Sequence, residues 1–153
     1  MTARRRLLAA ASATFAVTAL TACEKPAPLV TVVSGGTSVY SEAATYCFDE
    51  GQILDGDTAC ASRETEVRRI EVRQGERIGI DVDKELVERG WQLEIIDPAD
   101  AERTQGSSTI TDHYFPFTAP GIAPGGSLGL TVRTVDESGA ATGEWKFELV
   151  NRA

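Results

Sequence analysis

Apolar and polar residues alternate with a period of two along most of the chain after residue 28. The segment 29–34 (LVTVVS) starts this pattern, and Gly35-Gly36 provides a turn before 37–48 (TSVYSEAATYCF). Neighbouring side chains of a strand point to opposite faces of a sheet, so this alternation predicts half-buried β-strands. It returns in six further segments: 66–73, 77–83, 91–97, 110–117, 127–135 and 144–150.

One face of each predicted strand collects the apolar side chains. The sets that share a face are Arg68, Ile70 and Val72; Ile78, Ile80 and Val82; Trp91, Leu93 and Ile95; His113, Phe115 and Phe117; and Trp145, Phe147 and Leu149. One short helical turn is expected between Asp83, which can cap a helix, and Gly90, which can end it. Seven or eight short strands with almost no helix predict an all-β, immunoglobulin-like antiparallel β-sandwich over residues 29–153.

The N-terminus has the organisation of an export signal. Arg4, Arg5 and Arg6 precede an apolar stretch of 14 residues, 7–20, which is too short to span roughly 30 Å of hydrocarbon as a helix. The motif Leu20-Thr21-Ala22-Cys23 that follows resembles a bacterial lipobox. We therefore expect residues 1–22 to be a cleaved lipoprotein signal peptide, Cys23 to carry the lipid, and residues 23–28 to form a short tether.

A lipid on Cys23 determines where the protein is expected to act. Each buried methylene contributes roughly 0.8 kcal/mol to membrane binding. Two acyl chains such as palmitate on this cysteine therefore give stable anchoring, whereas a single chain does so only marginally. The prediction is an exported protein held on the outer face of the cytoplasmic membrane. Plain secretion with an unmodified Cys23 is the alternative, and either the general secretory or the twin-arginine route fits the signal.

The composition after cleavage excludes one class of partner. Removing the three signal arginines leaves 12 basic and 23 acidic residues, a formal charge of −11, against −8 for the whole chain. Such a surface repels nucleic acid, so we expect no nucleic-acid partner. No cofactor is expected either, because the chain after residue 22 has no methionine and a single histidine for copper.

Two cysteines remain when Cys23 is assigned to the lipid. Outside the cytoplasm, an even pair such as Cys47 and Cys60 predicts a disulfide, which in the chain-entropy model stabilises the fold by about 3 kcal/mol. No second pair of cysteines or histidines completes a zinc site. The two cysteines are too close in sequence to be the bridge of an antibody domain, and Trp91 follows both of them.

Four segments also resemble a family of actinobacterial lipoproteins of unknown function. They are PLVTVV at 28–33, TYC at 45–47 with the second cysteine a loop away, RGWQLEIIDP at 89–98, and LTVRTVDESGAATGEWKFELV at 130–150. This resemblance covers most of residues 28–150. It implies export, lipid anchoring and a disulfide bond, and it implies no activity.

The loop between the two cysteines offers candidate metal ligands. It carries Asp49, Glu50, Asp55 and Asp57, and closely spaced carboxylates are what Ca²⁺ requires. The loop lacks the ligand order of an EF-hand, so a solvated acidic loop is the favoured interpretation and a Ca²⁺ site is the alternative.

Two residues of 110–117 are further candidates. His113 follows Asp112, but neighbours in a strand point to opposite faces, so a catalytic pair is geometrically poor and a structural histidine is favoured. Tyr114 lies on the face opposite Phe115 and Phe117 and is the candidate for an exposed platform that binds a glycan or a peptide.

No catalytic constellation accompanies these residues. We therefore expect a non-enzymatic binding or accessory module for an envelope protein or another envelope component, to which the edge strands of the sandwich could also contribute. The alternative function is a small-ligand or Ca²⁺-binding module that uses the acidic disulfide loop.

Overall fold

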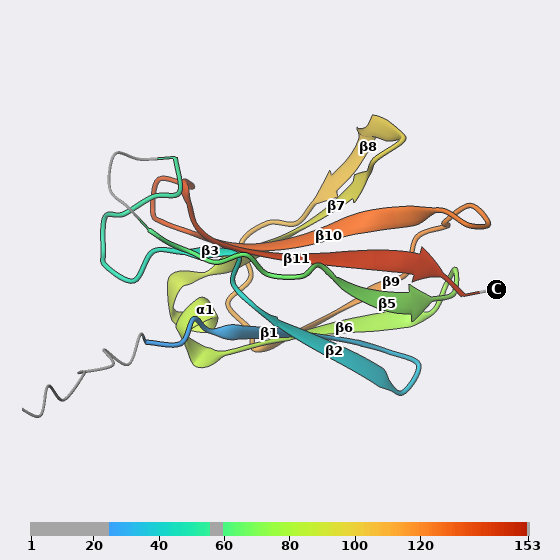
Figure 1. The fold of residues 1–153 in the computed structure, drawn as a ribbon, viewed down its shortest axis with the longest axis horizontal. Helices are drawn as coiled ribbons and strands as arrows, with labels where there is room; N and C mark the ends of the chain where they lie inside the picture. The colour runs from blue at the N-terminus through green and yellow to red at the C-terminus, as the bar shows by residue number, and fades with distance from the viewer. Residues whose placement is uncertain (1–24, 56–59, 153) are drawn as a thin grey trace, which may run out of the picture.

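Two facing β-sheets and one short helix make up the fold (Figure 1). The computed structural model describes residues 25–55 and 60–152, which contain eleven strands. The elements are β1 Leu29–Ser34, β2 Thr37–Glu42, β3 Thr45–Tyr46, β4 Ala61–Ser62, β5 Arg68–Val72, β6 Arg77–Val82, α1 Lys84–Arg89, β7 Trp91–Asp97, β8 Asp100–Gly106, β9 Tyr114–Thr118, β10 Ser127–Val135 and β11 Ala141–Asn151.

The predicted all-β sandwich is confirmed, with more strands than the seven or eight expected. One sheet has four antiparallel strands in the order β2-β1-β6-β9. The other has seven, in the order β4-β3-β11-β10-β7-β8, with β5 paired in parallel to the far end of β11. The predicted segment 37–48 splits because its chain leaves the four-stranded sheet after β2 and joins the other sheet as β3.

The core lies between the sheets and contains most of the predicted inward residues. Ile95, Phe115 and Phe117 are half-buried against it, and His113, predicted on the same face as the two phenylalanines, is exposed. Trp91 and Trp145 are fully buried, and each indole N–H donates to a backbone carbonyl, of Asp112 (3.0 Å) and Pro28 (2.8 Å) respectively. Arg68 shares a strand face with Ile70 and Val72 but stays exposed at the start of β5. Buried partners of the tryptophans are Val30, Val32, Ile70, Val72, Ile78, Ile80, Val82, Leu93, Leu130, Val132, Phe147 and Leu149.

The helix α1 forms where it was predicted, between Asp83 and Gly90. Gly90 adopts a φ of 81°, a left-handed conformation that glycine adopts without a steric penalty. The Asp83 carboxylate makes no capping bond to α1. It instead accepts a hydrogen bond from the Leu29 backbone N–H at 2.7 Å, and thereby fixes the start of β1.

Strand β8 was not predicted from the sequence. Its residues, DAERTQG, are almost all polar and show no apolar alternation. It forms because the chain turns back at 98–99 and pairs with β7, and the resulting hairpin projects beyond the rest of the seven-stranded sheet (Figure 1).

The last residues of the predicted tether are part of the folded domain. Ala27 and Pro28 are buried, and the Pro28 carbonyl accepts the Trp145 bond. The predicted tether of residues 23–28 therefore ends at Pro26 in the structure. Cys23 and the predicted signal peptide 1–22 lie outside the described residues. No helix within residues 25–55 and 60–152 is long and apolar enough to cross a bilayer.

Replacing Trp145 with Phe is expected to lower the free energy of unfolding by about 2–4 kcal/mol, since it leaves a cavity and a buried carbonyl without its donor. Urea titration followed by circular dichroism measures the change. Lys84→Ala, on the exposed surface of α1, is the control and should stay within about 0.5 kcal/mol of the original protein. Equal stability of Trp145→Phe and Lys84→Ala would contradict the assigned role of the indole.

Candidate binding face

The outer face of the four-stranded sheet carries most of the large apolar side chains that the described surface exposes. Four such residues are exposed, and three of them lie here: Leu29 (37%), Tyr40 (65%) and Tyr114 (49%). We call this surface the tyrosine face. Its members are Leu29, Thr31, Val33, Ser38, Tyr40, Glu42, Arg77, Gly79, Asp81, Tyr114, Pro116 and Thr118.

Strand register places four of these residues in one row across the sheet. Tyr40 is opposite Thr31, Thr31 is opposite Asp81, and Asp81 is opposite Tyr114. Neighbouring strands are about 4.8 Å apart, so the row spans about 14 Å between the backbones of the two tyrosines. The row therefore has a tyrosine at each end, and the Thr31 hydroxyl and the Asp81 carboxylate belong to the two strands between them.

The ring of Tyr114 lies over the backbone of Gly79. A Cβ built on Gly79 would come within 2.2 Å of the tyrosine oxygen and 2.4 Å of ring atom Cε2. Only a residue without a side chain allows this approach, which leaves Tyr114 covering β6 while about half of the side chain stays exposed. Gly79 thus determines how Tyr114 is presented.

Two charged side chains on the tyrosine face are exposed and unpaired. Arg77 and Asp81 flank Gly79 on β6, and neither makes a side-chain hydrogen bond or ion pair within the described part of the chain. Glu42, at the edge of the face, is paired with Arg63 at 2.7 Å. The Asp81 carboxylate, within the row, and the Arg77 guanidinium, at the start of β6, are therefore available to a ligand.

The outer face of the seven-stranded sheet is different, because its charges neutralise one another. Arg133 lies between Glu94 (2.8 Å) and Glu144 (3.2 Å), and Lys146 contacts Glu144 at 2.6 Å. Burial raises the pKa of Glu144, but the Lys146 ammonium and the Arg133 guanidinium outweigh it and hold that pKa below its ordinary value of 4.5. The charged groups Glu94, Arg133, Glu144 and Lys146 of this face are thus paired with one another.

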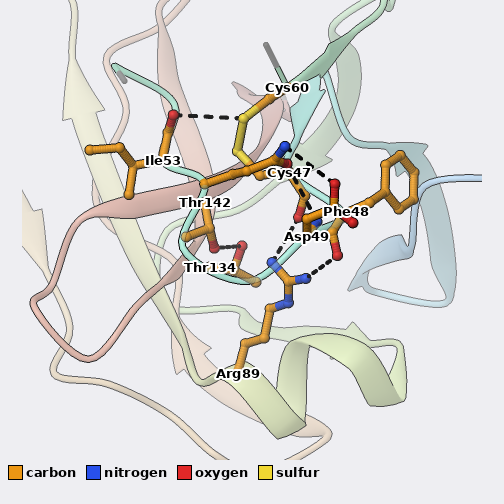
Figure 2. The surroundings of a disulfide bond; sticks show 9 residues. Cys47, Phe48, Asp49, Ile53, Cys60, Arg89, Thr134 and Thr142 are labelled. Atoms are coloured by element: carbon orange, nitrogen blue, oxygen red, sulfur yellow. Dashed lines mark hydrogen bonds between the residues drawn. A yellow bond between two sulfur atoms is a disulfide. The ribbon is translucent and has the colours of Figure 1, made fainter. Parts of the chain in front are cut away.

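The predicted disulfide between Cys47 and Cys60 is confirmed (Figure 2). Arg89 at the end of α1 donates to the carbonyl oxygens of Cys47 (2.8 Å) and Phe48 (3.0 Å), and its guanidinium stacks over Tyr46. The beginning of the loop is thus held to the helix as well as to Cys60. These contacts are structural and use two of the Arg89 N–H donors.

The acidic loop does not assemble a metal site from its described residues. Asp49 bonds to Gln52 within its own turn, and Glu50 and Asp55 are exposed. Asp57 lies outside the described residues. No three ligand side chains converge as a metal site anywhere in residues 25–55 and 60–152.

An open depression of about 530 Å³ adjoins this loop and carries further carboxylates. One of them, Asp136, accepts hydrogen bonds from the Ser138 hydroxyl (2.7 Å), the Ser138 N–H and the Ala140 N–H. The Ser138 hydroxyl bond, followed by the Ala140 N–H bond, lowers the Asp136 pKa. Asp136 therefore shapes the β10–β11 turn through Oδ1, which accepts all three hydrogen bonds.

His113 lies just before β9 and contacts the backbone of β6. Its Nδ1 is 3.1 Å from the Val82 carbonyl oxygen and, in the tautomer that carries the proton on Nδ1, donates a hydrogen bond to it. The neighbouring Asp112 contributes its carbonyl to the Trp91 bond. Both residues therefore help to join the start of β9 to the rest of the sandwich.

Among the residues of the tyrosine face, only Tyr114 was predicted from the sequence as a binding candidate. Three other members were missed: Tyr40, Asp81 and Leu29. Each lies on the outward-facing, polar side of its own strand, where a single exposed residue is ordinary. Their significance comes from adjacency across four strands. The only local signal for Tyr40 is its position between Val39 and Ser41, which places it on the outer face.

Glu144 is expected to make stability depend on acid pH. Its folded pKa lies below the ordinary value, so its stabilisation is complete above the unfolded pKa and is lost as pH falls through the folded pKa. Glu144→Gln should therefore destabilise the protein at pH 7, and the difference from the original chain should shrink below about pH 4. Urea titrations across that range measure it. A difference that is constant with pH would contradict the ion-pair assignment.

Neither a scan against models of known protein families nor a search of curated proteins finds a match to this chain. The resemblance to actinobacterial lipoproteins of unknown function stays a prediction.

Proposed function

We propose that the protein is a non-enzymatic, lipid-anchored binding module that holds its tyrosine face against a component of the cell envelope, on the outer side of the cytoplasmic membrane. The observation that carries this proposal is the difference between the two outer faces. One balances its charges in a chain of ion pairs, whereas the other exposes two tyrosines, a leucine and unpaired Arg77 and Asp81. An exposed apolar cluster with free polar groups is typical of a binding surface.

The docked N-terminal segment supports a close association with the membrane. Only residues 24–26 separate Cys23 from buried Ala27. Four extended residue steps span at most about 14 Å, so a lipid on Cys23 would hold this end of the sandwich close to the bilayer. The loop that contains Cys47 and the helix α1 lie at the same end (Figure 1).

This arrangement leaves the tyrosine face on the flank of the domain. Strands β1 and β6 run between the anchored end and the distal turns, so their outer face would extend away from the membrane (Figure 1). A ligand lying alongside the sandwich would reach it without competition from lipid.

The surroundings of the single histidine support a binding role over a catalytic one. His113 is engaged with the Val82 carbonyl. Within the described residues, no serine or cysteine hydrogen-bonds to it as an activated nucleophile would.

Cys23→Ala is expected to move the protein from the membrane fraction to the soluble exported fraction, because the precursor can no longer receive its lipid. Fractionation with immunoblotting, and intact mass for the missing acyl groups, test this. Cys60→Ala is the matched control, since it removes another cysteine and should leave the protein on the membrane. Membrane retention of Cys23→Ala would contradict the anchor.

A photo-crosslinking probe installed at Ser38 reports what contacts the tyrosine face in native membranes. The double variant Tyr40→Ala/Tyr114→Ala is expected to reduce crosslinking at least fivefold, because truncating two exposed anchors removes most of the contact surface. Val67→Ala removes the fourth exposed apolar side chain, which precedes β5 and is not a member of the tyrosine face, and serves as the control. Equal crosslinking in all three proteins would refute the assignment of this face.

A further inference from the structure

We infer that the ligand of the tyrosine face is a neutral, linear glycan chain that lies across the strands along the row from Tyr40 to Tyr114. This inference rests on the proposed binding function and specifies its ligand.

The two tyrosines suit the apolar faces of sugar rings. Tyr114 lies over Gly79 with about half of its surface exposed, so one side of the side chain rests on the sheet and the other remains available for stacking. Tyr40 is the most exposed large apolar residue described, at 65%. Tyrosine combines an apolar ring with a polar hydroxyl, which matches the mixed surface of a pyranose.

Polar groups in the row and further along β6 suit sugar hydroxyls. Asp81 is an acceptor and Arg77 a planar array of donors, and neither has a partner within the described residues. Thr31, in the same row, can both donate and accept. The face therefore offers acceptors and donors close to its stacking surfaces, as a polyhydroxylated ligand requires.

The size of the face favours a chain over a folded protein. Strands of about six residues and a width of about 14 Å give a footprint of about 300 Å². Stable protein interfaces bury about 800 Å² per partner, so a second copy of this chain or another globular protein would be held weakly by this surface alone. A short stretch of oligosaccharide matches both the length and the flatness of the row.

Charge and edge chemistry distinguish the glycan from other extended ligands. The formal charge of −8 for the whole chain disfavours a polyanion. A peptide that adds a strand would pair along a sheet edge and not across the tyrosine face, and at the β9 edge it would meet Pro116, which has no N–H to donate. A neutral glycan meets neither obstacle.

The test uses the mature, lipidated protein in nanodiscs and two neutral β-linked probes, cellohexaose and chitohexaose, in calorimetric titrations. Binding of at least one hexaose is expected. Tyr114→Ala and Tyr40→Ala should each weaken it about fivefold to tenfold, whereas Tyr114→Phe, which keeps the ring, should stay within about twofold. Gly79→Ala should also weaken it, because the new Cβ occupies the space of the Tyr114 ring. Val67→Ala is the control with unchanged affinity, and thermal unfolding verifies that each variant is folded.

Three results would overturn the inference. They are the absence of binding by both hexaoses at millimolar concentration, tighter binding of an anionic oligogalacturonate, and hexaose binding that survives both tyrosine variants. If the Ser38 probe captures a protein through the tyrosine face while neither hexaose binds, the glycan inference fails and the binding function stands. If the tyrosine variants change neither crosslinking nor hexaose binding, both fail.

Discussion

Two hydrogen bonds from buried tryptophans join the sheets at one end of the sandwich, and the placement of the binding face depends on them. Trp145 and Trp91 belong to the seven-stranded sheet, and their indole N–H groups reach carbonyls of Pro28 and Asp112. Each carbonyl lies just before a strand of the four-stranded sheet. A buried indole N–H without an acceptor is costly, so these bonds specify where β1 and β9 begin.

Those two strands carry Leu29 and Tyr114, and further backbone contacts reinforce their positions. The Asp83 carboxylate accepts the Leu29 N–H, and His113 bonds to the Val82 carbonyl at the end of β6. Gly79 then lets the Tyr114 ring lie over β6. The tyrosine face is thus formed by a rigid scaffold, which keeps its aromatic groups in place before any ligand arrives and reduces the entropic cost of binding.

The sequence predicted the features that depend on the local hydrophobic pattern or on the number of cysteines. Alternation identified Ile78, Ile80 and Val82 as inward-facing because one face of each strand is buried, and two cysteines remaining after the lipid site implied the disulfide. It could not predict β8, whose polar residues become a strand only through pairing with β7. Nor could it predict the tyrosine face, since Tyr40 and Tyr114 become neighbours only through the strand order β2-β1-β6-β9, which no local pattern specifies.

Hydroxyl-radical footprinting tests the central claim, that the tyrosine face is covered in the native envelope, most directly. The lipidated protein is labelled in isolated envelopes and after purification, and peptide mass spectrometry gives the modification rate at each residue. Strong protection of Tyr40 and Tyr114 is expected in the envelope, with little change at exposed Val67 and buried Tyr46. Equal labelling of Tyr40 and Tyr114 in both preparations would contradict it.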